Sequence, residues 1–225
     1  MKTTSDRGQR ARQRNARGQG GRLGEEIVTA ALALIDREGS EEAVTLRAVA
    51  REIGIAAPSI YPHFADRDAI VLAVVARLFD ELTTAVRAGL EDAGEDPVDQ
   101  LVAGCEAYVR FGLAHPARYR VLFSGNWPEA TASYCKPVVI EPGGRPVLEF
   151  GAEAFAQVVD AVAACVAAGA SASTDPFADG TAVWVALHGT VTLRSARPGF
   201  PWPEPASAFV RQLVLPLARI GIPRR

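Results

Sequence analysis

The side chains best suited to bind another molecule gather between residues 45 and 64, TLRAVAREIGIAAPSIYPHF. In the second half of this stretch, Ser59, Tyr61 and His63 carry groups that can donate and accept hydrogen bonds at base edges or phosphates. In the first half, the hydroxyl of Thr45 and the guanidinium of Arg47 could position the stretch on a phosphate backbone. The chemistry predicted here is recognition of duplex DNA.

The spacing in this stretch predicts a helix, a tight turn and a second short helix that carries the DNA-reading side chains. Thr45 can cap the first helix, because its hydroxyl can accept a hydrogen bond from a free backbone N–H of the first turn. Gly54 stands where a left-handed backbone ends a helix, and Pro58 suits the first turn of the next one. Upstream, apolar residues at helical spacing predict a first helix over residues 23–39. An ordinary helical hairpin would share much of this pattern.

Four short strings in and after this stretch, TLRxVA, GI, SIYxHF and DRDAI, occur in fixed order and spacing. Together they resemble the DNA-binding domain of the tetracycline-repressor (TetR) family over about residues 23–80. The resemblance implies a three-helix head over residues 23–68. It also implies that Arg67, in the first turn of the following helix, holds the DNA backbone. Because Arg67 lies between two aspartates, it could equally form a surface ion pair.

Charge is distributed unevenly along the chain. Residues 1–24 contain seven basic side chains and one acidic one, whereas the net charge of the whole chain is −2. A basic segment on an acidic body is typical of a protein that meets a polyanion at one end. Residues 1–22 are therefore predicted to form a flexible basic arm that contacts DNA, with a solubilising tail as the alternative.

Apolar residues recur at helical spacing in several blocks after residue 66. They predict one long helix over residues 67–90 and further helices over residues 97–115, 116–123, 147–168, 177–194 and 206–220. Residues 127–144, rich in proline and glycine, are predicted to form a loop. The strings YRVLF at residues 119–123 and Trp184…His188-Gly189 resemble the Trp-His-Gly class of TetR-family C-terminal domains. The chain is therefore predicted to be all-α, with a helical ligand-binding and dimerisation domain over residues 69–225.

This resemblance implies a mainly apolar ligand pocket in the second domain. Its candidate walls are aromatic residues and one histidine from several predicted helices: Tyr108, Phe111, Phe123, Trp127, Phe155, Trp184 and His188. Because Trp184 and His188 lie four residues apart on one helix face, they could instead form a packed pair in the core. The resemblance also implies that the last two helices pair with a second copy through small residues: Ala182, Ala186, Gly189 and Ala196.

Catalysis and cofactor binding find little support in the sequence. His63, His115 and His188 fall in different segments without metal-ligand spacing, and no G-x-S-x-G, P-loop or dinucleotide-binding string occurs. The three cysteines have no C-x-x-C spacing and are predicted to be buried thiols of an intracellular protein. No uninterrupted apolar run of about 18 residues suggests a membrane span. No catalytic residue, metal or cofactor is expected, and the predicted location is the cytoplasm.

These features together predict a transcription regulator, most simply a repressor. As a homodimer it would bind a palindromic DNA operator, with half-sites about one helical turn apart. A small, mainly apolar effector would release it by favouring the form that does not bind DNA. Two alternatives remain: a DNA-binding regulator without a small-molecule ligand, and an enzyme that uses a cavity in the second domain. The operator sequence, the target genes and the effector are not encoded in any pattern of the chain.

Overall fold

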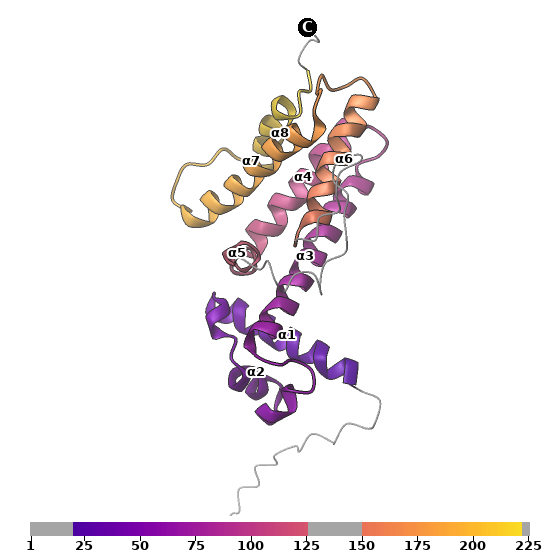
Figure 1. Ribbon diagram of the computed structural model, residues 1–225. Helices are drawn as coiled ribbons and strands as arrows, with labels where there is room; N and C mark the ends of the chain where they lie inside the picture. The colour runs from indigo at the N-terminus through magenta and orange to yellow at the C-terminus, as the bar shows by residue number, and fades with distance from the viewer. Residues whose placement is uncertain (1–19, 126–149, 222–225) are drawn as a thin grey trace, which may run out of the picture.

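The computed structural model describes residues 20–125 and 150–221, and this part of the chain is helical throughout its regular structure. Figure 1 shows an elongated molecule with a small N-terminal head at one end and a larger bundle of helices, the body, at the other. The all-α fold predicted from the sequence is confirmed. Among the described residues, no helix is both long enough and apolar enough to cross a membrane.

The head consists of α1 (Gly20–Glu38), the 3-10 helix η1 (Glu41–Ala43), α2 (Leu46–Ile53) and the 3-10 helix η2 (Ala57–Ile60). Helix α1 begins three residues earlier than predicted, so residues 20–22 of the expected arm are helical. Its apolar stripe is buried and packs against α2 and α3. The short helix η1 is not predicted by the sequence pattern, and it leads directly into α2.

Helix α3 (Arg67–Asp92) connects the head to the body as one continuous helix (Figure 1). Asp66 caps it as expected, because its carboxylate accepts a hydrogen bond from the backbone N–H of Ala69 at 2.8 Å. The predicted division between residues 68 and 69 falls inside the first turn of this helix. Ten of its residues are buried along its whole length, so α3 contributes to the packing of both parts.

The body contains α4 (Pro97–Ala114), α5 (Pro116–Ser124), α6 (Ala152–Ala167), α7 (Pro176–Ala196) and α8 (Ala206–Leu217). Helix α4 lies in the middle and packs against α3, α5, α6, α7 and α8. Two glycines allow α3 and α4 to approach closely: a Cβ on Gly89 would lie 2.8 Å from the carbonyl oxygen of Ala103, and a Cβ on Gly104 would lie 2.8 Å from Leu90. Residues 127–144, predicted to be a loop, lie outside the described residues.

Two of the three cysteines fall in the described part of the body, and both are buried free thiols. Burial raises the pKa of Cys105 to about 12 and that of Cys165 to about 11. Because the thiolate is the reactive form, these groups are poor nucleophiles at neutral pH. Their placement agrees with the predicted role as core residues, whereas Cys135 lies outside the described residues.

Candidate nucleic-acid interface and aromatic cluster

The first helix of the predicted helix-turn-helix has the local structure that its sequence indicates. The hydroxyl oxygen of Thr45 accepts a hydrogen bond from the backbone N–H of Ala48 at 3.1 Å. Gly54 ends α2 with φ of 69°, in the left-handed region. While it caps the helix, the Thr45 hydroxyl keeps its own hydrogen, which can still be donated to a phosphate.

The second helix of this motif is short, as predicted, and it ends at Ile60, before Tyr61 and His63. It is a single 3-10 turn, η2, followed by a turn that is closed by hydrogen bonds from the His63 and Phe64 N–H groups to the Ile60 carbonyl. The physical reason lies in two prolines four residues apart. Pro58 begins η2 favourably, but Pro62 has no N–H to donate to the Pro58 carbonyl, so an α-helix cannot continue through it.

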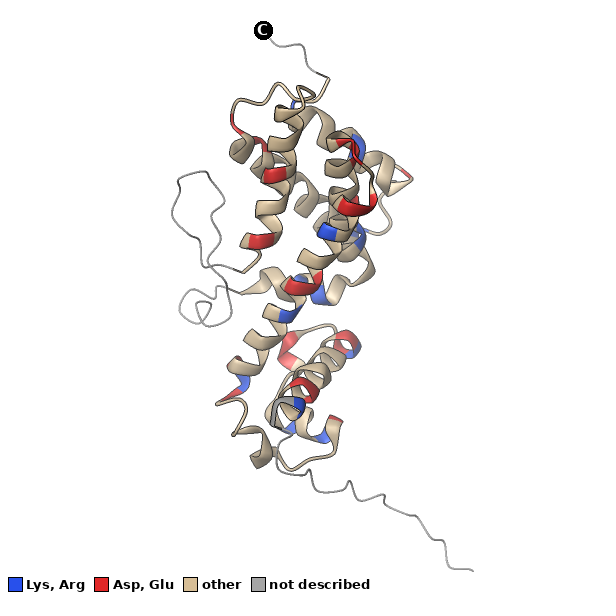
Figure 2. Cartoon of the chain, turned by 90° about the vertical axis from the view of Figure 1, so that its right-hand side faces the viewer, with Lys and Arg blue, Asp and Glu red and all other residues tan. Residues whose placement is uncertain are grey.

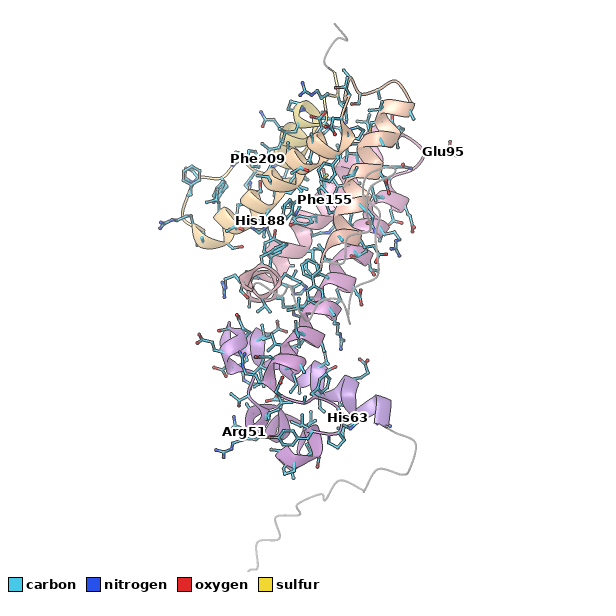
Figure 3. The ribbon with its side chains drawn as sticks, viewed as in Figure 1. Arg51, His63, Glu95, Phe155, His188 and Phe209 are labelled. Atoms are coloured by element: carbon cyan, nitrogen blue, oxygen red, sulfur yellow. The ribbon has the colours of Figure 1, made fainter. Side chains whose placement is uncertain are left out.

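The predicted DNA-reading residues lie around the buried Ile60 side chain, at the end of the head that is farthest from the body. The Ile60 side chain is fully buried, whereas the next residue, Tyr61, is 57% exposed. Ser59 is exposed, and His63 is partly buried with its ring beside Gly24 of α1. Figure 3 shows His63 and Arg51 at the end of the head that is farthest from the body. This end of the head therefore exposes Tyr61 and Ser59 and part of His63 next to the buried Ile60 side chain.

Arginine side chains of α2 supply positive charge beside this segment. Arg47 and Arg51 lie one helical turn apart and are exposed, and within the described residues neither guanidinium makes a hydrogen bond or ion pair. Arg37 of α1 is also exposed, but it is held by Glu52 through two contacts of 3.1 and 3.2 Å. Arg51 is not among the residues predicted from the sequence, although its spacing from Arg47 was a usable signal.

The Arg67 side chain forms hydrogen bonds within the head. Its guanidinium donates to the carbonyl of Val44 at 2.9 Å, to the carbonyl of Glu41 at 2.7 Å and to the Asp68 carboxylate at 3.0 Å. These hydrogen bonds fasten the start of α3 to the segment between α1 and α2. The ion-pair alternative is thus present in the structure, and a phosphate contact by Arg67 stays a prediction.

In the body, five of the predicted pocket residues form an aromatic cluster together with Tyr119. We define this cluster as those five residues and Tyr119, which are linked by ring contacts or hydrogen bonds: Tyr108, Tyr119, Phe123, Phe155, Trp184 and His188. The ring centroids of Phe123 and His188 are 4.6 Å apart, and those of Phe155 and Trp184 are 5.9 Å apart. Figure 3 shows Phe155 and His188 within the body.

Of the two remaining predicted pocket residues, only Phe111 falls in the described part of the chain. Phe111 faces His115 at the end of α4, with ring centroids 5.8 Å apart, and within the described residues its ring does not meet those of the cluster. Trp127 lies outside the described residues. Phe79 of α3, which the sequence does not single out, packs edge-on against Phe123 and stacks on Phe150. The cluster is therefore connected to the long helix that enters the head.

A chain of hydrogen bonds crosses the cluster. The hydroxyls of Tyr108 and Tyr119 are 2.7 Å apart, and the Tyr119 hydroxyl is 2.8 Å from Nδ1 of His188. Either hydroxyl can donate to the other, and Nδ1 of His188 accepts or donates according to the tautomer of the ring. The other ring nitrogen, Nε2, lies 3.5 Å from the Thr192 hydroxyl.

Burial governs protonation in this chain of hydrogen bonds. It raises the pKa of Tyr108 to about 12 and raises the pKa of Tyr119, so both phenols keep their hydrogens at neutral pH. Burial also lowers the pKa of His188, because the charged ring would lose hydration.

Stability should consequently fall when the solution is made mildly acidic. The pKa of His188 is lower in the folded protein than the value of about 6.5 expected in the unfolded chain. At pH values near and below about 6.5, the unfolded chain therefore binds more protons than the folded protein. The unfolding free energy consequently decreases as the pH falls through this range. We expect the unfolding free energy, measured by urea titration between pH 7.5 and 5.5, to decrease less in His188→Gln than in the wild type. An exposed-histidine control, His115→Gln, should follow the wild type, and equal pH dependence in all three proteins would contradict the assignment.

The arrangement of the head and the body is typical of one class of protein. A helix-turn-helix with exposed arginines, joined through one long helix to an all-helical body, is the architecture of a helix-turn-helix transcription regulator. Two family models agree. Residues 27–74 match bacterial regulatory proteins of the tetR family, and residues 101–217 match the tetracyclin repressor-like C-terminal domain. The second match covers more than half of the 225 residues, and the chain belongs to the TetR family of transcription regulators.

Relatives in sequence are regulators of the same kind. The chain is 36% identical over 114 residues to the uncharacterized HTH-type transcriptional regulator Rv0681 of Mycobacterium tuberculosis, over 48% of this chain and 50% of that protein. It is 33% identical over 79 residues to the HTH-type transcriptional regulator BetI of Stenotrophomonas maltophilia, over 35% of this chain and 40% of that protein. The chain thus spans at most half the length of these curated relatives.

Solved structures share the fold across nearly the whole chain. A protein of unknown function from Rhodococcus sp. RHA1 superposes with a TM-score of 0.71 at 24% identity, over 91% of this chain and 95% of that one. A TetR family transcription regulator from Marinobacter aquaeolei VT8 superposes with a TM-score of 0.62 at 16% identity, over 90% and 98% of the two chains. At these identities the likeness establishes the architecture and nothing finer.

Proposed function

We propose that this TetR-family regulator is a repressor that binds a palindromic operator as a homodimer and is released by a small, mainly apolar effector. The observation that carries the DNA-binding role is the exposed Tyr61 beside the fully buried Ile60. This pair presents an aromatic hydroxyl next to a buried apolar side chain. The exposed Arg47 and Arg51 on the preceding helix would hold phosphates on either side.

The proposed dimer interface is the outward face of α7. Val185 and Leu193, two turns apart, are 58% and 53% exposed, which is unusual for large apolar residues of a helix in a packed body. Gly189 lies between them, and a Cβ added there would meet nothing within 4 Å in the described part of the chain. Two such stripes related by a two-fold axis would cover each other and set the two heads side by side.

The proposed effector site is the aromatic cluster, because it combines apolar rings with a few oriented polar groups. The rings are packed against one another, so an effector would have to part them. It would release DNA only by binding the non-binding arrangement more tightly, and couplings of about 1–3 kcal/mol are usual. The same packing favours the alternative of a regulator without a small-molecule ligand, which a screen for operator release would reveal by finding no active compound.

Selection of bound sequences from random duplex DNA tests the proposed DNA-reading segment. We expect the intact protein to enrich a palindromic consensus. Each base contact is worth about 1–3 kcal/mol, so the double variant Tyr61→Ala, His63→Ala should lose at least about thirtyfold in affinity for that consensus. The variant Phe200→Ala is the matched control, since it removes an equally exposed aromatic side chain far from the head. A consensus indifferent to Tyr61 and His63 would contradict this segment's role.

Salt titration of the selected site separates phosphate contacts from base contacts. Replacement of Arg47 or Arg51 by Gln should weaken binding to all sequences alike and reduce the slope of log affinity against log salt by about one for each phosphate that is no longer neutralised. The matched control is Arg37→Gln, because that guanidinium is already held by Glu52. An unchanged slope in both α2 variants would mean that their arginines do not face the backbone.

A further inference from the structure

The hydrogen-bonding side chains of the aromatic cluster are uncharged at neutral pH. Burial raises the pKa of both tyrosines, Tyr108 and Tyr119, and lowers the pKa of His188. The other three members of the cluster carry phenyl or indole rings, which do not ionise. The cluster can therefore exchange hydrogen bonds with a ligand, but it supplies no charge that would pair with one.

The buried charged side chains of the body lie away from the aromatic cluster. Among the described residues they are Asp179 and Arg194, near the two ends of α7. The Asp179 carboxylate accepts from Nε of Arg219 at 3.3 Å, and Arg194 donates to the Glu204 carboxylate at 2.6 Å. From the usual rise per helical residue, each lies about 9 Å or more along the helix axis from His188. Both already have an ionic partner, so neither is available to an ion in the cluster.

Two arginines flank Tyr119 in the sequence, but both extend toward the head. Arg118 donates to the two carboxylate oxygens of Asp36 in α1, at 2.8 and 2.6 Å. Arg120 donates to the carbonyl of Gly39 at 2.9 Å. Figure 2 shows basic and acidic residues together where the head meets the body. The positive charges that lie closest to the cluster in the sequence therefore have partners in the head.

Trp184 and His188 of α7 form a partly exposed side of the cluster. Their ring centroids are 6.1 Å apart, whereas those of Phe123 and His188 are 4.6 Å apart. Nε2 of His188 lies 3.5 Å from the exposed Thr192 hydroxyl, at the long limit for a hydrogen bond. A ligand that enters beside Trp184 would meet a ring nitrogen that is only weakly engaged.

We propose that the aromatic cluster binds effectors that are uncharged and carry a hydroxyl or carbonyl group, which hydrogen-bonds to Nε2 of His188 while their apolar part lies beside Trp184. This inference rests on the proposed function and narrows the chemical class of its effector. A neutral imidazole nitrogen donates to a carbonyl or accepts from a hydroxyl according to its tautomer. An ionised effector would instead lose its hydration without gaining a partner of opposite charge.

Four probes that share a naphthalene ring test this inference: naphthol, methylnaphthalene, naphthalenesulfonate and naphthylmethyl-trimethylammonium. At pH 7.5 the first two are uncharged, whereas the sulfonate and the quaternary ammonium are charged throughout the usable pH range. We expect naphthol to bind the intact protein in a calorimetric titration, and both ions to bind at least about a hundredfold more weakly. An ion that binds within about tenfold of naphthol would overturn the inference.

Variants of His188 test the proposed hydrogen bond. In His188→Leu the ratio of the affinity for naphthol to that for methylnaphthalene should fall at least about fivefold, because a buried hydroxyl then lacks a partner. His188→Gln keeps a donor and an acceptor and should retain the ratio. His115→Leu is the control, since it removes an exposed histidine at the end of α4. Thermal unfolding must show each variant to be folded at the temperature of the titration. An unchanged ratio in His188→Leu would exclude Nε2 as the partner of the ligand and the inference with it.

Release of the selected duplex is measured separately with the same probes. If naphthol binds as expected but leaves the duplex bound, the proposed release by an effector fails and the inferred chemistry of the site stands. If an ion both binds and releases the duplex, the proposed release stands and the inference fails. Binding by none of the four probes would overturn the inference and favour a regulator without a small-molecule ligand.

Discussion

The double variant Val185→Glu, Leu193→Glu is expected to be a folded monomer that binds its operator about 10²–10⁴-fold more weakly. Both side chains are more than half exposed on one face of α7, so the isolated chain tolerates charge there. In a two-fold interface every substitution occurs twice, and four carboxylates would lose hydration next to one another. The loss of affinity follows because a dimer gains effective concentration at its second half-site.

Sedimentation equilibrium and operator titration measure the two parts of this result. Ala164→Glu is a suitable control, because it places the same charge on an exposed position of α6. Circular dichroism should show the same helical content in all three proteins. A double variant that still sediments as a dimer would exclude this face of α7 as the interface, whatever happens to DNA binding.

Local signals explain what the sequence predicts well. A helix cap depends on a side chain and a backbone N–H three residues later, so Thr45 and Asp66 can be assigned without tertiary information. The role of Gly54 in ending α2 can also be assigned locally, because it depends only on the left-handed backbone angle of that residue. The sequence predicts a second short helix in the motif, and the structure has one at Ala57–Ile60; its short length follows from Pro62, which has no N–H to continue the helix.

Interactions between distant segments explain what the sequence does not predict. Arg118 and Asp36 are 82 residues apart, and Arg67 meets a carbonyl 26 residues away, so neither partner could be chosen from spacing. Trp184 and His188 share a helix face, which the sequence shows, but the tyrosine that joins His188 to Tyr108 comes from another helix. The sequence assigns Phe111 to the same site as Tyr108, yet its ring faces His115.

The middle position of Tyr119 in the hydrogen-bond chain makes Tyr119→Phe the most damaging single-atom deletion that we expect in the body. The ring would keep its packing, but the Tyr108 hydroxyl and Nδ1 of His188 would each lose a hydrogen-bond partner. Tyr108 is only 3% exposed, so water cannot replace the missing partner, and a buried unsatisfied group costs about 1–3 kcal/mol. His188 is partly exposed and loses less. We expect the variant to be less stable by about 2–3 kcal/mol, and its Tm to be lower by about 5–10 °C.

The double variant Tyr108→Phe, Tyr119→Phe distinguishes an unsatisfied hydroxyl from a general loss of packing. It removes the hydroxyl that the single variant leaves unpaired, so its loss of stability should be clearly smaller than the sum of the two single losses. Tyr61→Phe serves as the control, because it deletes an exposed hydroxyl in the head and should leave the Tm unchanged. Additive losses for Tyr108 and Tyr119 would mean that the two hydroxyls do not depend on each other. The Tyr108–Tyr119–His188 chain of hydrogen bonds would then not act as one unit.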